Sequence, residues 1–159
     1  MRKDKLNYYL DIALAVSERS TCMRRQYGCV IVKDDRIVST GYNGSPRGYV
    51  NCIDVMECKR EKLNIPRGER YEMCQAVHAE ANAIIHASYQ DLIESTVYIA
   101  GKIVIRNKYN NDLLFKNTYD TPPCSMCNLL IKNAKVNNVV YRKSQDEIVV
   151  FPPSDLPEY

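Results

Sequence analysis

Long apolar runs are missing from this 159-residue chain. No stretch approaches the ~20 apolar residues that a helix needs to span a bilayer, so we expect no membrane partner. The charged start, Met1 to Lys5, has no apolar segment behind it, which predicts no secretory signal and a cytoplasmic location. Internal repeats and linkers are also missing. The length indicates a single domain over 1–159, with a core at about 4–145 and a C-terminal tail at 146–159.

A strong excess of one charge is missing as well. The net charge is only +3 and no long basic stripe is present, so nucleic acid is not an expected partner. Hydrophobic residues make up 45% and charged residues 26%, which are ordinary values for a globular domain. Histidine is scarce, with two residues, whereas there are seven cysteines. In a reducing compartment these thiols indicate metal ligands or core residues before disulfides.

Two short motifs carry residues with metal-binding chemistry. One is His78-Ala79-Glu80 and the other is Cys124-Ser125-Met126-Cys127 after two prolines. The prolines favour a helix start, so both cysteines should lie in a first turn, where the helix dipole favours thiolates. His78 and Glu80 are two residues apart and can converge only near the start of a helix. One imidazole and two thiolates would hold a catalytic zinc and leave its fourth position for water.

The remaining pattern predicts alternating helices and strands. We expect helices over 4–18, from His78 to about Ser88, and after the cysteine motif to Ala134. We expect strands over 28–33, 36–40, 95–100 and 138–142, and an added hairpin at 103–106 and 113–115. Cys29 should be a small buried residue in the first strand. The charged run 59–62 should be exposed. Such alternation is typical of a three-layer α/β fold.

The paired motifs resemble the cytidine and deoxycytidylate deaminase superfamily, for which H-x-E followed by P-C-x-x-C is the established signature. Glu80 and Cys124 have 43 residues between them. Within the superfamily, the chain most resembles the deoxycytidylate (dCMP) deaminases, through 41–48 (GYNGSPRG), Asn51-Cys52 and Asn82-Ala83-Ile84. The resemblance runs from the first helix to about Arg142. It implies a three-layer α/β/α cytidine deaminase-like fold, whose central mixed sheet of about five strands is flanked by helices.

The same resemblance implies a zinc-dependent hydrolysis of dCMP to dUMP and ammonia. Glu80 would take a proton from water and return protons to N3 and the leaving amine. The expected substrate-binding residues are Ala79, Asn82 and Asn43, with Arg25 or Arg47 at the phosphate. Many members are hexamers regulated by dCTP and dTTP, so we expect a homo-oligomer and a Mg²⁺–nucleotide triphosphate effector. The segment 101–121 is longer than the family pattern.

Other functions share these residues. A tRNA-adenosine, free-base or cytidine deaminase would use the same catalytic set, although Asn82 and the loop at 41–48 favour a mononucleotide. A non-catalytic nucleotide-sensing protein would not need Glu80. A structural zinc protein with one His and three Cys would also leave Glu80 unexplained.

Four further cysteines predict a second, structural zinc. Cys22, Cys52, Cys58 and Cys74 remain once the catalytic pair and Cys29 are set aside. A zinc held by four thiolates would order the aperiodic segment 50–74. Some phage dCMP deaminases resemble this arrangement at Cys22 and Cys52, with histidines of a longer insert as the other two ligands. The alternative is four free thiols.

Overall fold

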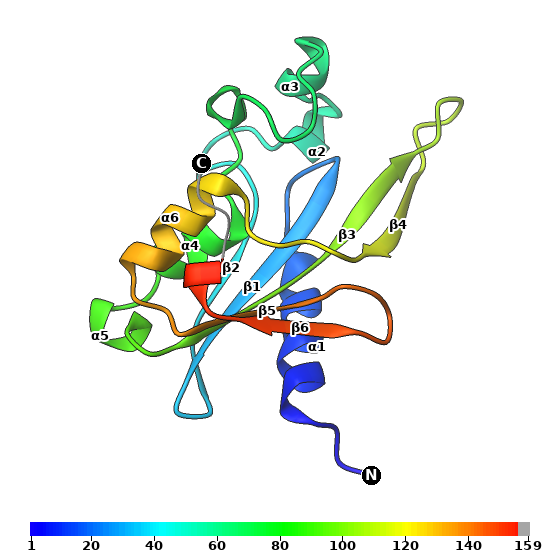
Figure 1. Ribbon diagram of the computed structural model, residues 1–159. Helices are drawn as coiled ribbons and strands as arrows, with labels where there is room; N and C mark the ends of the chain where they lie inside the picture. The colour runs from blue at the N-terminus through cyan, green and yellow to red at the C-terminus, as the bar shows by residue number, and fades with distance from the viewer. Residues whose placement is uncertain (156–159) are drawn as a thin grey trace.

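A mixed sheet of six strands organises the described part of this computed structural model, residues 1–155 (Figure 1). The strands are β1 (Arg25–Lys33), β2 (Arg36–Tyr42), β3 (Thr96–Arg106), β4 (Leu113–Thr118), β5 (Asn138–Arg142) and β6 (Ile148–Phe151). Their order is β2-β1-β3-β5-β6, and β4 pairs with the far half of β3. Only β3 and β5 run parallel; the other pairs are antiparallel.

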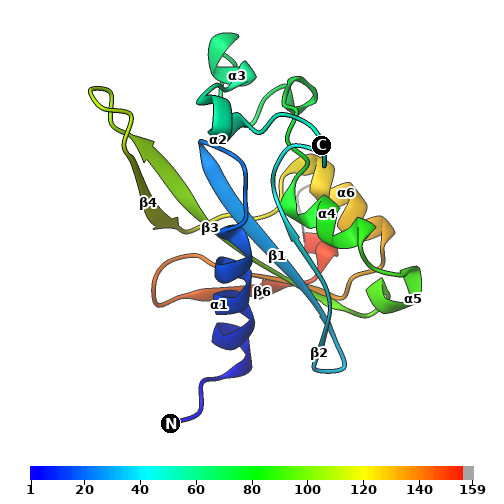
Figure 2. The ribbon, with the colours of Figure 1, turned by 180° about the vertical axis from the view of Figure 1, so that it is seen from behind.

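Helices cover both faces of this sheet. Helix α1 (Lys5–Ser17) lies on one face (Figure 2), and α4 (Ala79–Ile85) and α6 (Ser125–Asn133) lie side by side on the other (Figure 1). The shorter elements are α2 (Cys52–Val55), α3 (Lys59–Lys62), η1 (Tyr71–Met73), α5 (Tyr89–Leu92) and η2 (Pro153–Asp155). The predicted three-layer α/β/α fold with a mixed sheet is therefore confirmed.

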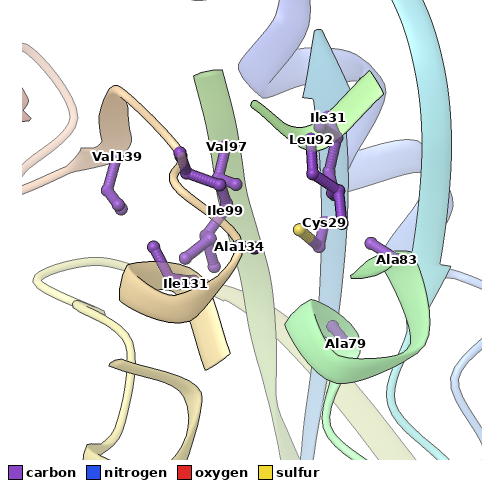
Figure 3. Packing of buried hydrophobic residues seen from close by; sticks show 11 residues of the cluster. Cys29, Ile31, Ala79, Ala83, Leu92, Val97, Ile99, Ile131, Ala134 and Val139 are labelled. Carbon is purple, nitrogen blue, oxygen red and sulfur yellow. The ribbon is translucent and has the colours of Figure 1, made fainter. Parts of the chain in front are cut away.

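Side chains of β1 alternate between two cores. Val30 and Val32 pack with Tyr9, Leu10 and Ala13 of the helix on one face. Cys29 and Ile31 point to the opposite face, where they pack with residues of α4 and α6 (Figure 3). Because successive side chains of a strand point to opposite sides, β1 is apolar on both faces and buried almost throughout. The prediction that Cys29 is a buried small residue is confirmed.

The backbone of α4 rests directly on β2. A Cβ atom at Gly41 would lie 2.3 Å from the Ala83 nitrogen and 2.4 Å from the Ala79 oxygen, so only glycine permits this approach. Two hydrogen bonds tie the same elements together. Ser39 Oγ donates to the Ala83 carbonyl at 2.5 Å, and Asn82 Nδ2 donates to the Tyr42 carbonyl at 2.8 Å. These contacts fix the position of α4 relative to the sheet.

The structure differs from the sequence prediction at several boundaries. The sheet has six strands where about five were expected, because β6 lies within the segment 146–159 that was assigned to a tail. The predicted strand 95–100 and the first arm of the added hairpin are one continuous strand, β3. Residues 156–159 lie outside the described part. Within residues 1–155, no helix is both long and apolar enough to cross a membrane.

Candidate metal centre and active-site cavity

Three ligand atoms converge where α4 and α6 begin. His78 and Cys124 are the residues that immediately precede the two helices, and Cys127 lies in the first turn of α6. Nδ1 of His78 lies 3.3 Å from Cys124 Sγ and 3.5 Å from Cys127 Sγ. The three ligand atoms all lie within 4.8 Å of one another, a spacing that no other group of three His, Cys, Asp or Glu side chains reaches within residues 1–155.

This donor set fits zinc. A nitrogen and two sulfurs at this spacing can share one tetrahedral ion, and three protein ligands leave one position open. The hydrogen bonds that Cys124 forms with Cys127 and His78 lower the pKa of Cys124, so its sulfur is a thiolate at neutral pH. The hydrogen bond to Cys124 in turn raises the pKa of His78, although burial and the charge of Arg60 act in the opposite direction. Thiolate is the form of cysteine that binds metals.

Glu80 lies beside the three ligands without belonging to the group. It is 8% exposed, and burial raises the pKa of its carboxyl group, partly opposed by the charge of His78. A buried carboxyl group with a raised pKa can both accept and return a proton near neutral pH. Its position as the second residue of α4 places it in the wall of the cavity that adjoins the metal ligands.

That cavity has a volume of about 460 Å³, within the range of small-ligand sites. Its walls come from the loops around β1, the segment 52–76, and the starts of α4 and α6. The structure brings most of the sequence-predicted site residues to it. Those that line it are Glu80, His78, Cys124, Cys22, Cys52, Cys58, Cys74, Asn43, Arg25 and Ala79.

Two predicted substrate-binding residues do not line the cavity. Arg47 lies in the exposed loop after β2, and the side chain of Asn82 binds the backbone of β2 instead. Asn43 does line it, but its amide already has three protein partners. It accepts hydrogen bonds from Ser20 Oγ and the Tyr27 nitrogen, both at 2.7 Å, and donates to the Arg25 carbonyl at 2.9 Å. Asn43 therefore holds the start of β1 in place as well as facing the cavity.

The four remaining cysteines also line this cavity. Burial raises the pKa of Cys22, and the neighbouring Cys74 and Cys58 raise it further. Burial and the other three thiols act in the same direction on Cys52. Four cysteines from separate segments are thus close enough to influence one another. In the described chain, however, no three of these sulfur atoms are all within 4.8 Å of one another, so they form a looser cluster than the catalytic group.

Arg60 and Tyr71 are among the cavity residues that were not predicted from the sequence. The run 59–62 was expected to be exposed, which is wrong for Arg60, because its side chain is covered by the loop that follows. Tyr71 packs edge-on against His78, with ring centres 5.0 Å apart. The guanidinium carbon of Arg60 lies 4.9 Å from the centre of the Tyr71 ring. No local sequence pattern predicts either contact, since both depend on how the segment 58–74 folds back toward His78.

An α/β/α fold with an open one-histidine, two-cysteine site and a buried glutamate defines a hydrolase of the zinc deaminase type. A family model described as "Cytidine and deoxycytidylate deaminase zinc-binding region" matches residues 3–143. The chain belongs to this family.

Individual relatives agree with that assignment. The deoxycytidylate deaminase of Mycobacterium phage D29 is 35% identical over 147 residues, covering 89% of this chain and 97% of the relative. The deoxycytidylate deaminase of Schizosaccharomyces pombe is 33% identical over 138 residues, covering 87% of this chain but only 37% of the relative. Thus the chain spans nearly the whole phage protein and a little over a third of the yeast protein.

The fold also matches a solved structure. The crystal structure of dCMP deaminase from the cyanophage S-TIM5 aligns with a TM-score of 0.56 and 24% identity, covering 87% of this chain and 82% of that one. The likeness supports the cytidine deaminase-like architecture.

Proposed function

We propose that this chain hydrolyses dCMP to dUMP and ammonia. The observation that carries the proposal is the placement of a buried glutamate beside three converging zinc ligands, at one end of a cavity with room for a nucleotide. The names of the phage and yeast relatives support dCMP as the substrate. A second structure of the cyanophage enzyme, in complex with dCMP and dUMP, has a related fold that accommodates such ligands.

The residues of the chain have distinct roles in this reaction. His78, Cys124 and Cys127 would hold the zinc, which when bound supplies Lewis-acid activation of a water molecule. Glu80 would accept one proton from that water as the water oxygen adds to C4 of cytosine, and would deliver that proton to N3. It would then take the remaining proton from the new C4 hydroxyl group and pass it to the amino group. The C4–N bond breaks, ammonia leaves, and the C4 oxygen becomes the carbonyl of uracil. The burial of Glu80 supports this role, because burial raises the pKa of its carboxyl group, which helps that group to hold a proton between accepting and donating it.

Ammonia release across a panel of substrates tests the proposal. The panel contains dCMP, dCTP, CMP, deoxycytidine, cytidine, cytosine and the matching adenine compounds. We expect dCMP to have the highest kcat/KM. A higher value for an adenine compound or free cytosine would overturn the substrate assignment, and no turnover by a fully zinc-loaded chain would overturn the enzymatic function.

We also propose a second zinc, held by Cys22, Cys52, Cys58 and Cys74. Its support is that four thiols from separate segments line the cavity and lie close enough to influence one another. Binding would draw the four sulfurs together and tie α2 and α3 to the start of β1. Metal analysis should find two zincs per chain in the wild type and one in both Cys58→Ser and His78→Ala. One zinc in a fully active wild-type chain would exclude this site.

Assembly, effectors and location remain predictions. A homo-oligomer, with the hexamer as the expected form, is supported by exposed apolar side chains on α4 and α6, among them Ile85, Met126 and Leu129. Light scattering of the purified chain tests it. A Mg²⁺–nucleotide triphosphate effector would be detected as a change in the dCMP saturation curve when dCTP or dTTP is added. We expect a cytoplasmic protein that binds neither nucleic acid nor membrane.

A further inference from the structure

A buried cation without an ion-pair partner in the described chain lies in the wall of the cavity. Arg60, in α3, is only 7% exposed and lines the cavity that adjoins the metal ligands. No carboxylate within residues 1–155 forms an ion pair with it, and its buried Nε has no hydrogen-bond partner there. Burying a charge is costly unless an opposite charge or hydrogen bonds compensate. This arrangement indicates that an anionic ligand completes the site.

The guanidinium is held in a fixed orientation. Its Nη2 donates to the carbonyl oxygens of Pro66 at 2.6 Å and Glu69 at 2.7 Å. One face of the group packs against the ring of Tyr71, a cation–π contact at 4.9 Å. A planar guanidinium that is already immobilised loses little further entropy when it binds a phosphate, and its paired N–H groups suit phosphate oxygens.

The position of Arg60 suits the phosphate end of a nucleotide. The Tyr71 ring contacts both Arg60 and His78, so the guanidinium lies close to the metal ligands but on a different part of the cavity wall. A cytosine ring directed at His78 and Glu80 would therefore leave its phosphate on the side of the cavity where Arg60 lies.

The other arginines of the cavity are less suitable. Arg24 is already paired with Glu61, its Nε lying 3.1 Å from the carboxylate. Arg25 donates to the Tyr27 hydroxyl at 3.3 Å, and Arg67 is exposed to solvent. These residues add positive potential to the cavity, whereas Arg60 combines burial, fixed orientation and the lack of an ion-pair partner in the described chain.

We propose that Arg60 binds the 5′-phosphate of the substrate and so selects nucleotides over nucleosides. This inference rests on the proposed function. It also gives the segment 52–76 a role in substrate recognition, since the loop that follows α3 orients Arg60 through its carbonyl groups.

Steady-state kinetics of Arg60→Gln test the proposal, with Lys59→Gln as the matched control because Lys59 is the exposed neighbour in the same short helix. We expect Arg60→Gln to raise KM for dCMP by about 10- to 100-fold, the loss expected for hydrogen bonds to a charged group. Its kcat for dCMP should change less than its KM. The kinetic constants of Arg60→Gln for deoxycytidine should stay within about threefold of the wild-type values. The constants of Lys59→Gln for both substrates should stay within the same limit. An unchanged KM for dCMP, or an equal loss for both substrates, would overturn the proposal.

A second variant and a binding measurement separate this proposal from folding defects and from the proposed function. Arg60→Lys keeps the charge but lacks the planar pair of donors, so it should recover part of the dCMP affinity lost in Arg60→Gln. If Arg60→Gln does not fold, Arg60→Lys should still raise KM for dCMP more than KM for deoxycytidine. An equal rise for both substrates would overturn the phosphate-binding role of Arg60. Calorimetric binding of dUMP and deoxyuridine needs no turnover. If the wild-type chain binds dUMP no better than deoxyuridine, the proposed role of Arg60 is overturned even when dCMP is deaminated. If the chain binds dUMP better than deoxyuridine but does not deaminate dCMP, the proposed function fails while the phosphate-binding role of Arg60 stands.

Discussion

At the scale of single residues, the proposed chemistry depends on a division between three side chains that would hold the metal and one that would move protons. His78, Cys124 and Cys127 converge to within 4.8 Å, while the Glu80 carboxyl group is buried next to them. These four positions could be predicted from the sequence, because short motifs fix both the residue types and their places near helix starts. Arg60 and Tyr71 could not, since their burial depends on contacts with residues that follow at irregular spacing.

Replacing Glu80 with glutamine tests the division directly. Glutamine keeps the shape and hydrogen-bonding capacity of the side chain but cannot shuttle a proton, so kcat should fall by at least about 100-fold. Zinc content should not change, because Glu80 is outside the ligand group. Metal analysis and dCMP turnover measure the two effects together. Glu147→Gln, an exposed change outside the cavity, is the control.

Near-normal turnover in Glu80→Gln would contradict the proposed mechanism. Loss of zinc in the same variant would show instead that Glu80 supports the metal ligands, and the role of proton carrier would then lack its main support.

At the scale of elements, the position of α4 on β2 sets the geometry of the site. An apolar run rich in β-branched residues predicted the strand at 28–33, and turn residues after it predicted the hairpin with 36–40. The helix start at His78 could also be predicted. The register of α4 against Gly41 could not, because it arises from close approach of two backbones that are 38 or more residues apart in the chain. The addition of β6 at the sheet edge likewise depends on pairing with β5.

Adding one carbon at Gly41 should disturb both stability and metal binding. Gly41→Ala places a Cβ about 2.3 Å from the Ala83 nitrogen, so α4 must shift. We expect a loss of about 1–3 kcal/mol in the free energy of unfolding, as for overpacked cores. Zinc should bind more weakly, because His78 begins the same helix. Urea unfolding and zinc titration measure these effects, and Thr40→Ala, at an exposed neighbouring position, is the control. Unchanged stability and zinc affinity would show that α4 does not rest on β2 as described.

A salt bridge links α1 to β5 at the other face. Arg142 Nη2 donates to Asp11 at 2.7 Å, and Lys3 also bonds this carboxylate. The hydrogen bonds from Lys3 and Arg142 lower the pKa of Asp11 below its ordinary value of 3.8. A lowered pKa in the folded state means that this stabilisation is present above about pH 4 and is lost as the pH falls through the folded pKa.

Asp11→Asn should therefore destabilise the fold at neutral pH but not in acid. Because the carboxylate is 41% exposed, we expect a loss of only about 0.5 kcal/mol at pH 7. The difference from wild type should shrink at pH 3. Urea midpoints at both pH values provide the measurement, with the exposed Asp34→Asn as control. A difference that grows on acidification would contradict the sign of the pKa shift.

At the scale of the whole molecule, one cavity joins the catalytic group to the four-cysteine cluster. Two separate metal sites were predicted from the sequence, one from paired short motifs and one from four cysteines scattered between Cys22 and Cys74. The structure places both around the same space. A shared cavity could not be predicted, because it requires α2, α3 and η1 to fold over the starts of β1 and α4. Substrate recognition and the order of the segment 52–76 are therefore linked.

The conversion of dCMP by the zinc-loaded chain tests the central claim most directly. Product analysis should find one dUMP and one ammonia for each dCMP consumed. The reaction should stop when a chelator removes zinc from the catalytic ligands and resume when zinc is added back, because His78, Cys124 and Cys127 hold the metal that activates water. A folded, fully zinc-loaded chain that forms no dUMP, or one that forms it equally fast without zinc, would contradict the account.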